Sequence, residues 1–218
     1  LGARYVVEAE LGRGRVAVVY AAHDRQDGAA VAIKRWVPPP VDAEPARARL
    51  ARAVELGQRL DHPGIVRVHR LHYDGDCVLL VMDRAPGQTL TARVAERGPL
   101  TAAEVQALGL ELAAALDHAH GQLLLHGELH PDHVVIDDDG RALLLGFGGG
   151  ASGHARLGEG LDYAAPEVIG GEAADARADV YGLGLVLYFA TTGQLPKRPS
   201  AQLPPAPADR GHRPSAAA

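Results

Sequence analysis

Apolar and polar residues alternate along five segments in the first part of the chain, and glycine or proline residues separate these segments. Alternation with a period of two is typical of strands that bury one face. Three consecutive prolines, directly after Val37, mark the end of the third segment. We therefore predict five strands, at residues 5–11, 16–22, 30–36, 66–73 and 77–82.

Three other segments predict helices. Apolar residues recur three or four positions apart in residues 43–60 and again in residues 101–120. Thr101 and Glu104 have the spacing of a capping box, in which each side chain binds the other residue's backbone amide. Residues 180–196 carry no charge, but glycines interrupt them and they are too short for a typical membrane span. We expect a buried helix there.

The composition is that of a folded globular protein. Hydrophobic residues make up 47% of the 218 residues and charged residues 22%, unlike the proportions of disordered chains. The net charge of -5 gives no electrostatic basis for binding nucleic acid. Cys77 is the only cysteine, which excludes an internal disulfide framework and favours a reducing compartment. We expect a cytoplasmic protein with neither a signal peptide nor a membrane-spanning segment.

The end of the chain differs in composition from the rest. Six prolines lie between Pro196 and Ala218, among almost no large apolar residues. Such a segment cannot bury enough apolar surface to offset the entropy lost on ordering. We expect residues 197–218 to form a disordered tail or linker.

Seven short motifs follow one another along the chain. They are LGRGRVAVVY at 11–20, VAIK at 31–34, DHPGIV at 61–66, HGELHPDHVVI at 126–136, GFG at 146–148, APE at 165–167 and DVYGLG at 179–184. Their order and content resemble those of the protein kinase family. HGELHP is also similar to the HGDLHP loop of aminoglycoside and choline phosphotransferases. The APE and DVYGLG motifs favour the bacterial, eukaryotic-like Ser/Thr protein kinases instead.

The resemblance implies an α+β, bilobal, protein-kinase-like fold. Residues 1–84 would form a five-stranded small lobe with the family's αC helix, which corresponds to residues 43–60. Residues 85–196 would form a mostly helical large lobe, truncated after the αF helix that DVYGLG opens. This truncation would expose an apolar face of αF, and such a face is typical of a site for a protein partner.

The resemblance also locates the catalytic positions, several of which carry unusual residues. In the kinase loop HRDLxxxN the Asp accepts the substrate proton and the Asn binds magnesium, and here Glu128 and His133 take these places. Gly146 replaces the metal-binding Asp of DFG. Lys34 keeps the place of the phosphate-binding lysine, but Ala53 replaces its glutamate partner on αC. We expect no magnesium site, because magnesium requires oxygen ligands.

A nucleotide site could remain without the metal. By the resemblance, ATP would contact Leu11, Gly12, Gly14, Val19, Ala32, Lys34, Met82 and Val135. Arg13 and Arg15 could supply positive charge in place of the metal. The alternative is a plain hairpin turn with solvated arginines. We expect weak, metal-independent ATP binding at most.

Three further residues correspond to the structural frame of the family. Asp179 would accept hydrogen bonds from the backbone of the catalytic loop, while His126 and Phe147 would stack in the hydrophobic column that joins the lobes. The histidines at positions 118, 120, 126, 130 and 133 could also suggest zinc, but their spacing matches no common zinc pattern.

These residues predict a pseudokinase that serves as a regulatory or protein-interaction module, with Glu128 at a degenerate base position. Loss of a general base typically lowers a rate by ~10²–10⁴. The alternative is a slow ATP-dependent Ser/Thr kinase that uses Glu128 as its base. We expect no switching by phosphorylation of residues 149–164, because Ser152 is the only serine there, no threonine is present, and Gly127 replaces the arginine that would bind the phosphate.

Overall fold

The computed structural model describes residues 4–14, 17–36, 48, 51–52, 54–74, 77–147 and 162–195. The expected tail at 197–218, residues 149–161 of the activation segment, Gly148, Arg15 and Ala53 lie outside these ranges. What the sequence predicts for them stays a prediction.

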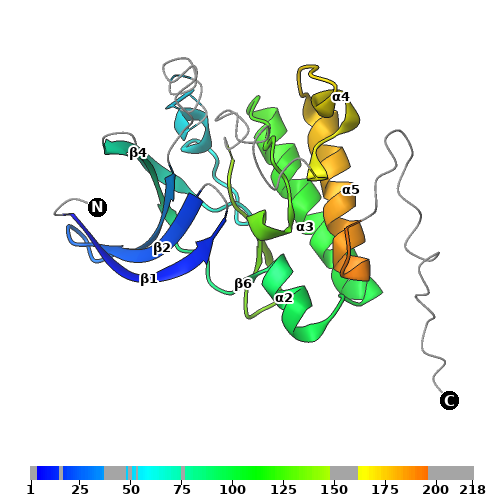
Figure 1. The fold of residues 1–218 in the computed structure, drawn as a ribbon, viewed down its shortest axis with the longest axis horizontal. Helices are drawn as coiled ribbons and strands as arrows, with labels where there is room; N and C mark the ends of the chain where they lie inside the picture. Colours follow the sequence, from blue (N-terminus) through cyan, green and yellow to red (C-terminus); the bar gives the residue numbers. More distant parts are fainter. Residues whose placement is uncertain are drawn as a thin grey trace.

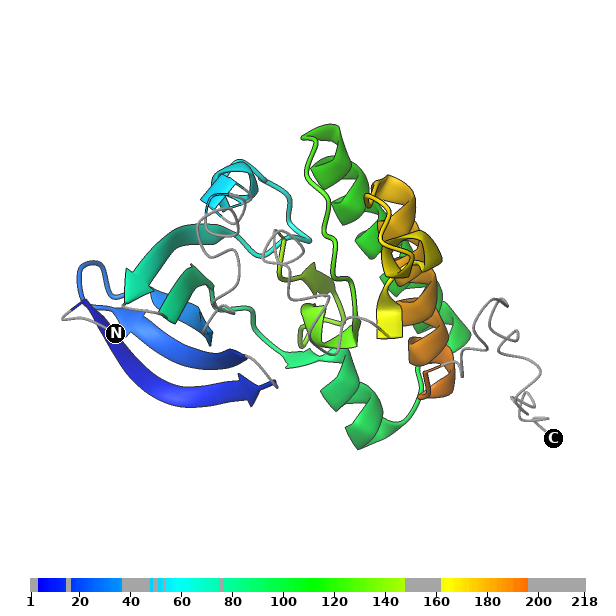
Figure 2. The same cartoon turned by 45° about the horizontal axis from the view of Figure 1, so that its top comes forward.

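The first sheet has five antiparallel strands in the spatial order β1-β2-β3-β5-β4 (Figures 1 and 2). The strands are β1 (Tyr5–Arg13), β2 (Ala17–Asp24), β3 (Ala30–Trp36), β4 (Val68–Asp74) and β5 (Cys77–Asp83). β3 has the predicted bounds, and the other four differ from the prediction by one or two residues at one or both ends. The prediction of five strands is confirmed.

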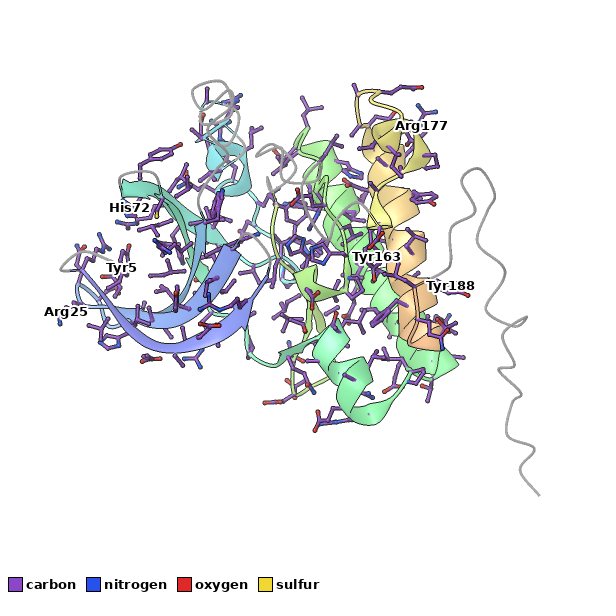
Figure 3. The ribbon with its side chains drawn as sticks, viewed as in Figure 1. Tyr5, Arg25, His72, Tyr163, Arg177 and Tyr188 are labelled. Atoms are coloured by element: carbon purple, nitrogen blue, oxygen red, sulfur yellow. The ribbon has the colours of Figure 1, made fainter. Side chains whose placement is uncertain are left out.

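Both faces of this sheet are apolar. One face forms a cluster that includes Ala32 and Met82 and also Val54, from the helical residues 54–57. The opposite face carries a second cluster, made of Tyr5, Ala22, Val31, Ile33, Leu79 and Val81; Figure 3 shows Tyr5 on the sheet. Residues 51–52 and 54–57 lie inside the helix predicted at 43–60, and the described helix ends at Gly57 rather than Leu60.

The second lobe is mostly helical. Its elements are β6 (Gln88–Thr89), α2 (Leu90–Arg97), α3 (Ala102–Gly121), the 3-10 turn η1 (Pro131–His133), β7 (Val134–Ile136), β8 (Ala142–Leu144), α4 (Pro166–Ile169) and α5 (Ala176–Thr192). The sequence did not predict α2 or the small sheet β6-β7-β8, because strands of two or three residues are too short to show a period. In both ribbon views the five-stranded sheet lies on one side and α3 and α5 on the other. The two-lobed α+β prediction is confirmed.

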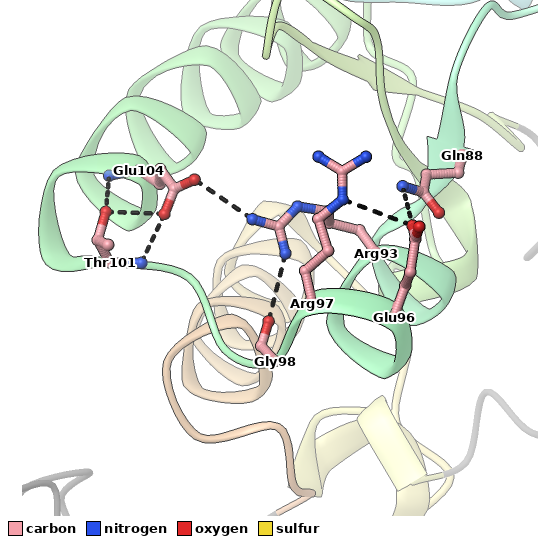
Figure 4. A network of polar contacts seen from close by, with 7 residues as sticks. All are labelled: Gln88, Arg93, Glu96, Arg97, Gly98, Thr101 and Glu104. Carbon is pink, nitrogen blue, oxygen red and sulfur yellow. Dashed lines mark hydrogen bonds and ion pairs between the residues drawn. The ribbon is translucent and has the colours of Figure 1, made fainter.

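The capping box predicted at the start of α3 is present (Figure 4). The Thr101 hydroxyl accepts a hydrogen bond from the Glu104 amide at 3.3 Å, and the Glu104 carboxylate accepts one from the Thr101 amide at 2.7 Å. Arg93 of α2 donates to the same carboxylate and to the Gly98 carbonyl, both at 3.4 Å. These contacts fix the turn between α2 and α3.

The core of the large lobe lies between α3 and α5. Leu112 of α3 and Val186 of α5 are fully buried members of one cluster. The Asp175 carboxylate caps α5 by accepting a hydrogen bond from the Arg177 amide at 2.8 Å. The helix predicted at 180–196 therefore exists, shifted by four residues toward the N-terminus at both ends. None of the helices in the described ranges is long and apolar enough to cross a bilayer.

Candidate functional site

A buried carboxylate holds the segment between α3 and η1. Asp179, in the first turn of α5, is only 2% exposed. Its Oδ1 accepts a hydrogen bond from the Gly127 amide and its Oδ2 accepts one from the His126 amide, both at 2.8 Å. The His120 Nε2 lies 2.8 Å from Oδ2. The carboxylate thereby fixes the backbone immediately before Glu128, as the family resemblance implied.

The His126 ring extends this anchor to the chain after β8. Its Nε2 donates to the Leu145 carbonyl at 2.7 Å, and its Nδ1 accepts from the Glu128 amide at 3.2 Å. The ring meets Phe147 edge-on, with centroids 5.0 Å apart. Burial lowers the pKa of His126, and the negative charge of Asp179 opposes that shift. A neutral ring with one donor and one acceptor suits these two contacts.

Four of the residues expected to hold a nucleotide lie on one face of the five-stranded sheet. Lys34 is opposite Val19 of β2, and Ala32 is opposite Met82 of β5. Opposed residues point to the same face, and so do residues two apart in one strand. Val19, Ala32 and Met82 also belong to or pack against one apolar cluster. The structure therefore brings these four residues together.

Val135 approaches the same cluster from the large lobe. It is opposite Leu143 in the antiparallel pair β7 and β8, so the two side chains share a face. Leu143 packs against the cluster that contains Ala32 and Met82. Val135 thus lies on the side of the large lobe that faces the sheet, as expected for a residue beneath an adenine ring.

The glycine-rich segment is more exposed than the apolar walls. Leu11 is 50% exposed, and Gly12 and Gly14 are exposed as well. The Gly14 amide donates to the Ala17 carbonyl at 2.9 Å, within the turn between β1 and β2. In its described part, this segment therefore has the geometry of a hairpin turn, and Gly12 lies opposite Val19, which packs against the apolar cluster.

The charge of Arg13 is already partnered. Its guanidinium forms two hydrogen bonds with the Glu10 carboxylate, at 2.9 and 2.6 Å. This ion pair lowers the pKa of Glu10 and raises that of Arg13. The expectation that Arg13 supplies positive charge in place of a metal stays a prediction, and any phosphate would share this guanidinium with the Glu10 carboxylate.

Lys34 brings a positive charge to this face of the sheet. Its side chain is partly exposed, and its Nζ lies 6.0 Å from the centre of the Trp36 ring. Burial lowers the pKa of Lys34, and the negative charge of Glu128 opposes that shift. The structure thus places Lys34 and Glu128, the two residues expected at catalytic positions, within electrostatic reach of each other.

The two positions expected to bind magnesium in active kinases do not fit that ion here. His133 donates from Nδ1 to the Glu128 carbonyl at 2.7 Å, and Gly146 has no side chain. Magnesium demands near-octahedral coordination by oxygen. Across the described ranges, no group of three or more His, Cys, Asp or Glu side chains is arranged to hold a metal ion.

Three histidine rings pack together beside these positions. The centroids of His130 and His133 are 3.9 Å apart, and His126 lies 5.4 Å from His133. Burial lowers the pKa of His130 to about 3, and the positive charges of His126 and Lys34 add to the shift. Burial likewise holds the pKa of His133 well below its usual value. The rings are therefore neutral at pH 7, and the motif alone did not reveal their stacking.

Tyr163 is a residue of this region that sequence reasoning missed. Figure 3 shows it beside α5, and its ring centroid lies 6.0 Å from that of His130. Burial raises its pKa, together with the negative charges of Asp132 and Asp162. In the sequence, the only indication of this residue was its place as a single aromatic residue just before the APE motif. Tyr163 lines a small cavity of about 20 Å³, roughly the room of one water molecule, with Gly127, Glu128, Asp179 and Gly182.

Replacing the anchor carboxylate tests its structural role. Asp179→Ala is expected to lower the free energy of unfolding by about 1–3 kcal/mol, because buried amides of the loop lose their acceptor. Urea unfolding followed by circular dichroism measures the loss. Asp138→Ala, at an exposed aspartate, is the matched control and should change stability by less than ~0.5 kcal/mol. Equal losses in the two variants would contradict the anchor role.

The neutral histidines predict that acid destabilises the fold. His130 has a folded pKa of about 3, below the value of about 6.5 for an unfolded histidine. Between these pH values only the unfolded chain binds the proton, so stability is full above pH ~6.5 and falls as the pH drops, by about 2 kcal/mol per such residue at pH 5. Urea unfolding from pH 7.5 to 5 measures the slope. His130→Gln should flatten it, and an unchanged slope would contradict the assignment.

The family model and the relatives found by comparison are all protein kinases. The model of the protein kinase domain matches residues 5–204. Sperm motility kinase 3A of Mus musculus is 31% identical over 210 residues, which are 90% of this chain and 39% of that protein. Serine/threonine-protein kinase PkaA of Streptomyces coelicolor is 32% identical over 217 residues, covering 90% of this chain and 40% of that protein. The chain thus spans about two fifths of the length of these relatives.

A solved structure agrees with the sequence comparison. The crystal structure of the Mycobacterium tuberculosis PknI kinase domain superposes with a TM-score of 0.81 at 31% identity. The alignment covers 95% of this chain and 82% of that domain. Because both the family model and this structure span most of the chain, the chain belongs to the protein kinase domain family.

Proposed function

We propose that this chain is a pseudokinase, a kinase domain that transfers no phosphate and serves as a regulatory or protein-interaction module. The observation that carries the proposal is the pair His133 and Gly146. Family members that transfer phosphate hold magnesium at these two positions, and their catalysis relies on positioning and on charge stabilisation by that metal. Here one position has an imidazole bound to a backbone carbonyl, and the other has no side chain.

The size of the expected loss supports inactivity. Several kcal/mol of missing transition-state stabilisation corresponds to at least ~10³ in rate. The longer carboxylate of Glu128 at the base position adds a further loss, up to the ~10²–10⁴ that a general base contributes. Because both effects act on the same step, we expect turnover below the level that signalling requires.

Weak binding of ATP without a metal is the second part of the proposal. The apolar residues Val19, Ala32 and Met82 lie on one face with Lys34, and Val135 faces them from the large lobe. An apolar slot suits an adenine ring, and an ammonium at its edge suits a phosphate oxygen. The carboxylate of Glu128 competes for the same ammonium, which is why the affinity should be low.

A protein partner is the third part. Ile169 of α4 and Val180 of α5 are 54% and 60% exposed, which gives the described large lobe apolar side chains on its surface. The single Cys77 is consistent with a cytoplasmic location.

A slow Ser/Thr kinase is the second candidate function. One observation favours it: the loop backbone before Glu128 is held by Asp179 as the family frame requires. A carboxylate at that position could still accept a proton from a substrate hydroxyl. This candidate requires that some other group take over the role of the metal.

Phosphate transfer is the direct test of the proposal. With radiolabelled ATP, casein as substrate and either magnesium or manganese, we expect no incorporation above that of Lys34→Met, which removes the phosphate-binding lysine. An active bacterial Ser/Thr kinase domain provides the positive control. Metal-dependent incorporation that disappears in Lys34→Met would establish the slow kinase instead.

Binding of ATP is tested by metal removal. We expect ATP at millimolar concentration to raise the unfolding temperature slightly, following RT ln(1 + [L]/Kd), and to do so equally with magnesium or with EDTA. Lys34→Met should reduce the shift, because it removes the cation that faces the phosphates. A shift that occurs only with magnesium would contradict metal independence.

A further inference from the structure

An aromatic ring already fills the space next to Gly146. This glycine has a φ of +89°, and a Cβ added to it would lie 3.2 Å from three atoms of the His133 ring, namely Cδ2, Cε1 and Nδ1. Ordinary van der Waals contacts of a Cβ are 3.4–4 Å. Equal distances to three ring atoms place the added carbon over the face of the ring. A side chain at position 146 therefore requires the His133 ring to move by at least a few tenths of an ångström.

Several contacts hold the His133 ring in that space. Its Nδ1 donates to the Glu128 carbonyl at 2.7 Å. The ring stacks on His130 at a centroid distance of 3.9 Å, and the His126 ring lies 5.4 Å away. Rotating the ring outward would break the hydrogen bond, leave a partly buried carbonyl without its donor and undo the stack. The ring is therefore a fixed part of the site.

The atoms around the ring do not suit magnesium. A magnesium ion placed among the rings of His126, His130 and His133 would find nitrogen atoms and carbon where it requires oxygen.

We propose that the His133 imidazole is an internal plug, which occupies the volume of the metal-binding side chain beside Gly146 and excludes magnesium and manganese ions from the cleft. The inference rests on the proposed function, since it gives metal-independent nucleotide binding a structural cause. Positions 133 and 146 depend on each other. An aspartate at position 146 has room only when the His133 ring is replaced, and replacing the ring alone supplies no carboxylate. A metal site therefore requires both substitutions, and neither one alone creates it.

The steric part of the proposal is tested by stability, without nucleotide or metal. Gly140 is the matched control for Gly146, because its φ is +80° and nothing lies within 4 Å of an added Cβ. Gly146→Ala should lower the unfolding temperature more than Gly140→Ala does. In a His133→Ala background the two alanine substitutions should have equal effects, and His133→Ser serves as a second background if the alanine variant folds poorly. A difference that persists in these backgrounds, or that is absent in the parent, would overturn the plug.

The chemical part is tested with Mn²⁺ and ATP in a thermal-shift titration. The variant with both His133→Asn and Gly146→Asp should gain an ATP shift that EDTA abolishes. Neither single variant should gain it, and the parent chain should show none. A gain in Gly146→Asp alone would overturn the plug, because the ring would then leave room for the carboxylate.

The two tests separate this inference from the proposed function. Phosphate transfer by the parent chain would refute the pseudokinase proposal, yet it would leave the result of the alanine comparison unchanged. Equal effects of Gly146→Ala and Gly140→Ala in the parent chain would refute the plug, and the absence of phosphate transfer would still support a pseudokinase.

Discussion

The arrangement of the site depends on one buried carboxylate. A charge removed from water costs several kcal/mol unless hydrogen bonds replace its hydration. Asp179 meets this requirement with the backbone amides of His126 and Gly127 and with His120, all at 2.8 Å. Because the carboxylate belongs to α5, the packing of α5 against α3 also fixes the loop. The loop in turn fixes the His126 ring, which donates to the Leu145 carbonyl and meets Phe147 edge-on.

These contacts explain how the fold of the loop can be kept when the side chains at the catalytic positions change. The contacts of Asp179 with the loop use backbone amides, so the identity of the side chain at position 128 does not enter them. Likewise, the hydrogen bond of His126 to Leu145 needs no metal or nucleotide. His133 adds a contact of its own to the loop, through the carbonyl of Glu128. The residue at a position that the resemblance assigns to metal binding thus makes a contact within the loop.

Local signals made much of the fold predictable. The capping box of Thr101 and Glu104 and the alternating strands are set by neighbouring residues, and each is found within one or two residues of its expected place. The short strands β6, β7 and β8 depend on pairing between distant segments, which no period reveals. The places of Lys34 in the sheet and of Asp179 beneath the loop were predictable, because the motifs there match the family. The motifs do not specify side-chain conformations. They therefore did not predict the ion pair of Arg13 with Glu10 or the stack of His130 on His133.

The central claim is that the catalytic loop is held by the fold itself, without nucleotide or metal. Hydrogen exchange at the amides of His126 and Gly127, in EDTA and without nucleotide, tests it most directly, because both amides donate to Asp179. We expect them to exchange only through global unfolding and at a rate that ATP with magnesium leaves unchanged, apart from any small increase in overall stability. Fast exchange that becomes slow only when ATP and magnesium are added would contradict the account.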